Sequence, residues 1–87
     1  MRGWQVYLLK CADLSLYCGI TNDLKARIDT HNAGKGAKYT RGRLPVELVA
    51  KSKDMTKSQA LKCEIHIKKL PTGKKVSTLI TQNFSRK

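Results

Sequence analysis

The sequence predicts an α+β fold, in which a small, three-stranded, mostly antiparallel sheet is flanked by two or three helices in the order β-β-α-β-α-(α). Two short runs rich in aliphatic, aromatic and β-branched residues, 4–10 and 15–21, are separated by a brief connection, which is typical of a hairpin. Helical patterns with capping signals follow over residues 22–34 and 56–71. The whole chain, 1–87, is expected to form a single domain.

The first helix is predicted by one stripe of side chains. At helical i, i+3, i+4 and i+7 spacing the chain carries Leu24, Arg27, Ile28 and His31. Asn22 or Asp23 supplies the N-cap, and Gly34 stands where a glycine commonly ends a helix. The glycine-containing and basic segment that follows, residues 34–43, is interpreted as a loop.

The second half of the chain supplies a strand and two further helices. A strand is predicted from Val46 to about Ser52, since the proline before it is tolerated at the start of a strand. The capping box over residues 56–59 begins a helix that runs to about Leu70, where a proline stops it. A last short helix is predicted over residues 72–82, with three apolar side chains to pack it: Val76, Leu79 and Ile80.

The chain is strongly basic. Eighteen Lys and Arg residues against six Asp and Glu residues give a formal charge of +12. Residues 1–34 hold four basic and three acidic side chains, whereas residues 35–87 hold fourteen and three. Such a charge attracts polyanions, of which nucleic acid is the commonest. An acidic membrane surface is the weaker alternative, because the basic residues are not confined to one face of an amphipathic helix.

Cysteine usage and hydropathy exclude several other classes of protein. The three cysteines include no C-x-x-C pair, which argues against a disulfide framework and against a thiolate zinc site. The longest apolar stretch, residues 6–9, is far too short to span a membrane, and no signal peptide is recognisable. We therefore expect a cytoplasmic protein with reduced thiols that does not enter a membrane.

Glu64 occupies an unusual place for a carboxylate. On a helical wheel at about 100° per residue it falls near the middle of an apolar arc, which is formed by Ala60, Leu61, Cys63, Ile65, Ile67 and Leu70. An unpaired buried carboxylate is costly, so Glu64 needs a cationic partner, a metal ion or a cleft that admits water. A neighbouring Lys or Arg would satisfy it as well as a metal would.

Four more side chains invite both a structural and a functional interpretation. Arg27 is either a surface arginine or a guanidinium at the domain edge that suits a phosphate, and His31 is either a packed histidine or part of a site. Tyr7 and Tyr17 face the same side of the sheet if the hairpin connection has an odd length or a bulge. They are either core residues or hydrogen-bond donors, and become proton acceptors if basic neighbours lower the phenol pKa.

Taken together, these residues resemble a known family. Val6-Tyr7-Leu8, with Tyr17-Cys18-Gly19 ten residues further on, resembles the signature hairpin of the GIY-YIG nuclease superfamily. The run over residues 32–40 is similar to the small, single-domain bacterial subgroup of that superfamily, and the resemblance extends over about residues 4–70. The positions that match catalytic residues of the family are Tyr7, Tyr17, Arg27, His31 and Glu64.

The resemblance implies a divalent-metal-dependent endonuclease that hydrolyses phosphodiester bonds in DNA, with RNA left open and with repair or recombination as the setting. It implies that Glu64 holds one Mg²⁺ or Mn²⁺ and that Arg27 grips the scissile phosphate. It further implies that Tyr7 or Tyr17 deprotonates or orients the attacking water, and that His31 joins their hydrogen-bond network. Structure-dependent cutting, a partner protein that supplies specificity, or low intrinsic specificity would each fit this chain.

The basic segment supplies a second group of candidate residues. We expect it to contact backbone phosphates outside the cut site, through Lys35, Lys38, Tyr39, Arg41 and Arg43. A merely solvated connection is the alternative. For the whole protein, the alternatives to a nuclease are a nucleic-acid-binding module that keeps the fold with little catalysis, and a small structural protein of a ribonucleoprotein.

Overall fold

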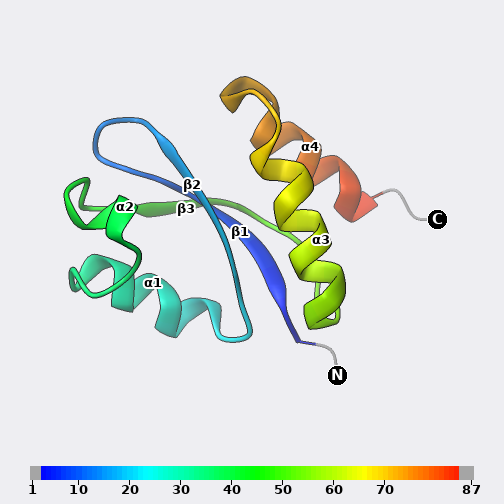
Figure 1. The fold of residues 1–87 in the computed structure, drawn as a ribbon, viewed down its shortest axis with the longest axis horizontal. Coiled ribbons are helices and arrows are strands. Elements are labelled where there is room, and N and C mark those ends of the chain that lie inside the picture. The colour runs from blue at the N-terminus through cyan, green and yellow to red at the C-terminus, as the bar shows by residue number, and fades with distance from the viewer. Residues whose placement is uncertain (1–2, 85–87) are drawn as a thin grey trace.

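The computed structural model describes residues 3–84. Along the chain, the secondary-structure elements are β1 (Gln5–Lys10), β2 (Leu16–Thr21), α1 (Leu24–Asn32), α2 (Lys38–Arg41), β3 (Glu47–Lys51), α3 (Lys57–Lys68) and α4 (Thr72–Phe84). The strands form one antiparallel sheet in the order β2-β1-β3, with α1 against one face and with α3 and α4 against the other (Figure 1). The predicted α+β class is confirmed, and the predicted elements differ from the observed ones by at most two residues at either end.

The central strand β1 is buried on both faces, so its four middle residues are all shielded from solvent. Because side chains alternate along a strand, Tyr7 and Leu9 point towards α1. Val6 and Leu8 point towards α3 and α4, in a cluster that includes Ala60, Ile67 and Leu79. The two faces of one strand therefore carry the two halves of the hydrophobic core.

Local capping chemistry sets the ends of the helices as predicted. The Asp23 carboxylate accepts a hydrogen bond from the Ala26 amide and begins α1, and Gly34 follows that helix with a φ of +79°, which favours glycine. At α3, Thr56 and Gln59 exchange the two hydrogen bonds of a capping box.

One segment departs from its prediction. Residues 38–41, expected to belong to a loop, form the helical turn α2, so residues 3–84 contain four helices where two or three were expected. A single turn has too few residues to show a helical period. It is held by its own local contacts, which include a hydrogen bond from the Thr40 amide to the Ala37 carbonyl.

The exposed side of α3 also corrects the prediction. Leu61 and Ile65, expected in the apolar arc, are 41% and 55% exposed, whereas Ala60 and Ile67 are fully buried. The helix meets the sheet and α4 along a narrow stripe, and Leu61 and Ile65 lie well round the helix from it. Glu64 consequently lies at the border of the buried stripe and not at its middle.

Helix α4 packs by Leu79 and Val76, as expected, but Ile80 is 41% exposed and does not belong to the core. Within residues 3–84, no helix combines the length and the apolar character needed to cross a bilayer.

The two isoleucines of α3 test this packing. We expect Ile67→Ala to lower the free energy of unfolding by about 2–5 kcal/mol, because it opens a cavity in the core. Ile65→Ala removes the same atoms from an exposed position and should change stability by about 0.5 kcal/mol or less. Urea unfolding of both variants measures the difference, and equal losses would contradict the observed orientation of α3.

Candidate active site

Four of the five predicted catalytic residues meet on the face of the sheet that α1 covers. Strand β1 supplies Tyr7, strand β2 supplies Tyr17, and α1 supplies Arg27 and His31. The Tyr7 hydroxyl lies 3.0 Å from His31 Nε2, and Arg27 Nε donates to the same hydroxyl at 3.4 Å. The Tyr17 ring lies 6.2 Å from the Tyr7 ring and 5.2 Å from the His31 ring, between centroids.

The hydrogen bonds of this cluster have a defined direction. Thr40 Oγ1 donates its single hydrogen to the Ala37 carbonyl at 2.9 Å, so it can only accept from His31 Nδ1, also at 2.9 Å. His31 therefore carries its ring hydrogen on Nδ1, and Nε2 accepts from the Tyr7 hydroxyl. The Tyr7 oxygen in turn accepts from Arg27. Sequence reasoning missed Thr40, since nothing in the pattern of the segment marks it.

Burial and hydrogen bonding shift the pKa values of Tyr7, His31 and Arg27. Burial raises the pKa of Tyr7 above 10.0, although the hydrogen bond from Arg27 opposes the shift. Burial, assisted by the positive charge of Arg27, lowers the pKa of His31 below 6.5. The hydrogen bond to Tyr7 raises the pKa of Arg27. At neutral pH these hydrogen-bonded groups are thus a guanidinium, an uncharged phenol and an uncharged imidazole. The lowered phenol pKa that a proton-acceptor role requires does not occur at Tyr7.

Two glycines leave the space that the cluster needs. Gly19 pairs with Tyr7 across the hairpin, and a Cβ built on it would lie 2.6 Å from the Tyr7 hydroxyl oxygen. A Cβ on Gly36 would collide with the His31 ring and would lie 2.9 Å from the His31 Cα atom, which cannot move aside without the helix. A glycine at either position therefore allows a close approach that any side chain would prevent.

Glu64 lies on the other face of the sheet. Its carboxylate pairs with Lys68 Nζ at 3.3 Å, one turn further along α3, and its side chain is 17% exposed. Burial first, and the negative charge of Glu64 second, raise the pKa of Cys18 to about 12, while Lys68 and Lys75 oppose the shift. Glu64 thus has a cationic partner, which is one of the three alternatives left open for it. Within residues 3–84, no hydrogen bond or ion pair joins it to Arg27 or to either tyrosine.

The edge strand β2 brings the two faces together. Tyr17 points towards Tyr7, Arg27 and His31, which we call the Arg27 cluster. The next residue, Cys18, points towards Glu64 and α3. Because β2 has no strand on its outer side, both residues border the same surface groove. The groove has a volume of about 260 Å³ and is lined by Leu16, Tyr17, Cys18, Tyr39, Lys68 and Lys75.

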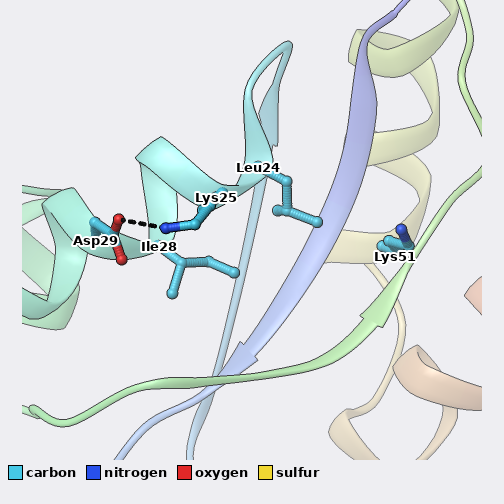
Figure 2. Close-up of a pocket in the computed structure, with 5 residues that line it drawn as sticks. All are labelled: Leu24, Lys25, Ile28, Asp29 and Lys51. Atoms are coloured by element: carbon cyan, nitrogen blue, oxygen red, sulfur yellow. Dashed lines mark ion pairs between the residues drawn. The ribbon is translucent and has the colours of Figure 1, made fainter.

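A larger hollow on the α1 side carries none of the predicted residues. It measures about 390 Å³ and is lined by Leu24, Lys25, Ile28, Asp29 and Lys51, with an ion pair of 3.6 Å between Lys25 and Asp29 (Figure 2). Besides Lys51, its lining consists of two aliphatic side chains and an ion pair, and it includes none of the tyrosine, arginine, histidine or glutamate residues predicted to be catalytic. The chemistry of the lining, and not the size of the hollow, therefore selects the groove beside β2.

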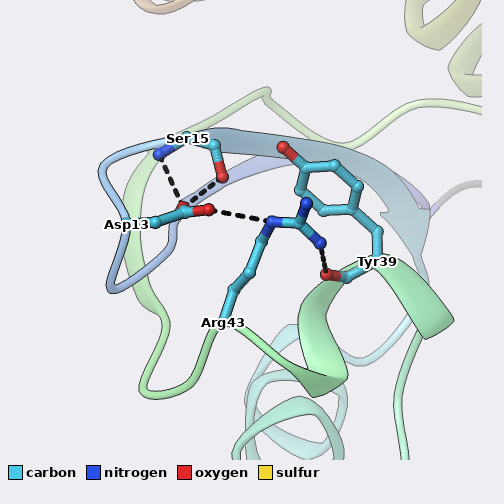
Figure 3. A network of polar contacts seen from close by, with 4 residues as sticks. All are labelled: Asp13, Ser15, Tyr39 and Arg43. Carbon is cyan, nitrogen blue, oxygen red and sulfur yellow. Dashed lines mark hydrogen bonds and ion pairs between the residues drawn. The ribbon is translucent and has the colours of Figure 1, made fainter.

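In the basic segment, Arg43 is already engaged by the protein. Its Nε donates to Asp13 at 2.9 Å, one Nη donates to the Tyr39 carbonyl at 2.7 Å, and the guanidinium lies 4.1 Å from the centre of the Tyr39 ring (Figure 3). Hydrogen bonds from Ser15 hold the pKa of Asp13 below its usual value, and Arg43 adds to that effect. Arg43 thus ties the hairpin turn to α2.

The other predicted residues of this segment divide into two kinds. Tyr39 is 40% exposed, stacks on Tyr17 at 6.0 Å between ring centres, and forms one wall of the groove. Arg41 Nε donates to the Gly36 carbonyl at 3.4 Å. Lys35 and Lys38 are exposed. The structure therefore leaves these two lysines at the surface while it builds Tyr39 and Arg43 into the framework of the site.

No group of three or more His, Cys, Asp or Glu side chains within residues 3–84 is arranged to hold a metal ion. Glu64 would therefore act as a single carboxylate ligand, which binds a metal through oxygen. Such a ligand fits a hard ion of the Mg²⁺ type, which keeps most of its water ligands and is otherwise bound by one or two carboxylates and by substrate phosphate.

Comparison with known proteins places these features in a family. The family model described as the GIY-YIG catalytic domain matches residues 3–75. The UPF0213 protein of Nitratidesulfovibrio vulgaris is 45% identical over 78 residues, which cover 90% of this chain and 71% of that protein. The UPF0213 protein YazA of Bacillus subtilis is 52% identical over 69 residues, 79% of this chain and 70% of that protein.

Two solved structures, both determined by solution NMR, are similar over nearly the whole chain. The UPF0213 protein BH0048 from Bacillus halodurans has 41% identity and a TM-score of 0.55, covering 97% of this chain and 88% of that one. The protein EF2693 from E. faecalis has 36% identity and a TM-score of 0.64, covering 100% of this chain and 92% of that one.

Two glycines of one segment test the packing around His31. We expect Gly36→Ala to lower the free energy of unfolding by about 1–3 kcal/mol, because its Cβ would overlap the ring and backbone of His31. Gly42→Ala should change it by about 0.5 kcal/mol or less, since its Cβ would meet no atom within 4 Å. Urea unfolding measures both, and a tolerated Gly36→Ala would show that the ring does not sit against this glycine.

The titration of His31 tests the burial of the cluster. Its ring should take up a proton below pH 6.5, because burial and Arg27 disfavour the charged form. In the unfolded chain His31 titrates normally, so its contribution to stability is present above about pH 6.5 and is lost as the pH falls towards the folded-state pKa. NMR titration of the ring protons measures this, with His66→Asn to assign the two histidines. A midpoint at or above 6.5 would contradict the described environment.

Proposed function

The chain belongs to the GIY-YIG family, and from that premise we propose that it is a divalent-metal-dependent endonuclease that hydrolyses phosphodiester bonds in DNA. The observation that carries the proposal is the groove along the edge of β2. Tyr17 and Cys18, which are consecutive, point to opposite faces of the sheet and both line it, so it adjoins the Arg27 cluster on one side and the Glu64–Lys68 pair on the other. Arg27 and Glu64 do not line the groove themselves, but each lies beside a residue that does, Arg27 beside Tyr17 and Glu64 beside Lys68.

In this proposal Arg27 binds the scissile phosphate. One of its N–H groups is donated to Tyr7, which orients the guanidinium, and other donors remain for phosphate oxygens. The guanidinium would stabilise the negative charge that grows on those oxygens as the attacking water bonds to phosphorus and the bond to the leaving sugar oxygen breaks.

The two tyrosines take different roles. Tyr7 is 1% exposed and cannot reach a substrate, so it acts through Arg27 and His31. Tyr17 is half-buried and lines the groove, and it is therefore the tyrosine that orients the attacking water. Hydrogen bonds from Tyr7 through His31 to Thr40 tie β1, α1 and α2 together beside this wall, while burial and the charge of Arg27 lower the pKa of His31 and keep the imidazole uncharged.

Glu64 is the residue that would hold Mg²⁺ or Mn²⁺. The ion, when bound, would supply charge stabilisation at the phosphate and at the leaving oxygen. The Glu64 carboxylate already pairs with one cation, the ammonium of Lys68, at the place where the metal ion would bind. Lys35 and Lys38, at the surface beyond Tyr39, would contact the backbone of DNA outside the cut site.

One observation favours a second candidate function. Glu64 contacts Lys68 and no member of the Arg27 cluster within the described residues, as would suit a nucleic-acid-binding module that keeps the nuclease fold with little catalysis. A role in repair or recombination, with specificity supplied by a partner protein, belongs to the first candidate.

Cleavage assays distinguish the two candidates. We expect the protein to cut at least one of nicked, flapped, branched or single-stranded DNA in Mg²⁺ and not in EDTA, with matching RNA substrates as a second arm. Glu64→Gln and Arg27→Ala should each reduce the rate on the order of 10²-fold or more while binding persists.

The chain offers matched controls for both substitutions. Glu47 is the only other glutamate and pairs with Lys10 at the surface, and Lys25 is a cation of the same helix as Arg27, paired with Asp29. Glu47→Gln and Lys25→Ala should cleave as the wild type does. Binding without cleavage of any substrate would select the module, and equal activity of all four variants would reject the assigned site.

A further inference from the structure

Lys75, in the first turns of α4, is held in place by the end of α3. Its ammonium donates to the carbonyls of Ile67 and Lys68, at 3.0 Å in both cases. Carbonyls in the last turn of a helix lack partners within that helix, and the helix dipole favours a cation there. Lys75 therefore closes the C-terminus of α3 and joins it to α4.

The same ammonium belongs to the groove. Lys75 lines it together with Lys68, across from Tyr17 and Tyr39. The charge of Lys75 lowers the pKa of the Cys18 thiol, as the charge of Lys68 does, while Glu64 raises it. Cys18 lies where the edge strand β2 meets α3. The cation is thus on the wall opposite the stacked tyrosines.

Lys75 differs from the neighbouring lysines because it is held in place by hydrogen bonds and still has a donor and a charge that a ligand can use. An ammonium has three N–H donors, and two are taken by carbonyls, which leaves one donor and the full positive charge. Lys68, the other lysine of the groove, is paired with Glu64. Lys74, the preceding residue, is exposed and does not line the groove. A charge that is already held in place loses little side-chain entropy when it binds a ligand.

We propose that Lys75 is a phosphate-binding residue, which makes the α3–α4 wall of the groove a second phosphate site opposite Tyr17 and Tyr39. The ligand is a phosphodiester oxygen of the nucleic-acid strand that the nuclease binds, so this inference rests on the proposed function. The residues expected to contact phosphates outside the cut site lie in the segment between α1 and β3, whereas Lys75 belongs to α4.

The test compares two adjacent lysines. Fluorescence anisotropy measures the binding of a labelled DNA that the wild type binds, in EDTA to prevent cleavage, over a range of salt concentrations. We expect Lys75→Met to weaken binding and to lower the slope of log K against log salt by about one, which is the loss of one phosphate contact. Lys74→Met should leave the slope unchanged, and Lys75→Arg should restore it because it keeps the charge.

A purely structural cap would give another pattern. Lys75→Met would then lower thermal stability but match Lys74→Met in affinity and salt slope at a temperature where circular dichroism shows both to be folded, and that result would overturn the inference while leaving the nuclease proposal intact. Where cleavage is measured, a raised KM with little change in kcat supports a binding role. A wild type that binds no nucleic acid would reject both proposals.

Discussion

The hydroxyl of Tyr7 lies inside the protein, where an unsatisfied polar group costs about 1–3 kcal/mol, and the site is organised around meeting that requirement. Its partners come from α1, through Arg27 and His31, and the chain of hydrogen bonds continues to Thr40 in α2. Two elements that are separate in the sequence, α1 and α2, are thereby tied to the central strand. Arg27 is aimed by the same contact, so the fold and the candidate chemistry depend on one buried oxygen.

The position of β2 at the edge of the sheet has an equally direct consequence. In a central strand such as β1, neighbouring side chains point into two cores that never meet. At an edge they border the same surface, and Tyr17 and Cys18 can lie next to the Arg27 cluster and to Glu64 respectively while both line one groove. A site between opposite faces of a sheet is therefore available only at its edge.

The charge of the chain serves two purposes. With eighteen basic side chains and six acidic ones, most cations cannot have a carboxylate of their own. Some of them act as framework: Arg43 ties the hairpin turn to α2, Lys68 balances Glu64, and Lys75 closes α3. Others, such as Lys35 and Lys38, remain at the surface, where they add to the field that attracts a polyanion. The excess charge is thus partly structural and partly available for binding.

Sequence alone determined whatever depends on near neighbours: the hairpin, the caps at Asp23 and Thr56, the order of the elements other than α2, and the family to which the tyrosines, Arg27 and Glu64 point. Tertiary structure decided the rest. Leu61 and Ile65 were expected in the buried stripe of α3 but are exposed. The apolar residues of α3 extend over more of the helix surface than the sheet and α4 cover. Lys68 is an i, i+4 neighbour of Glu64 in the same helix, but the contribution of Thr40 and the groove itself arise from separate elements. No local pattern encodes these two features, since the first needs α1 and α2 to pack together and the second needs β2, α2, α3 and α4 to meet.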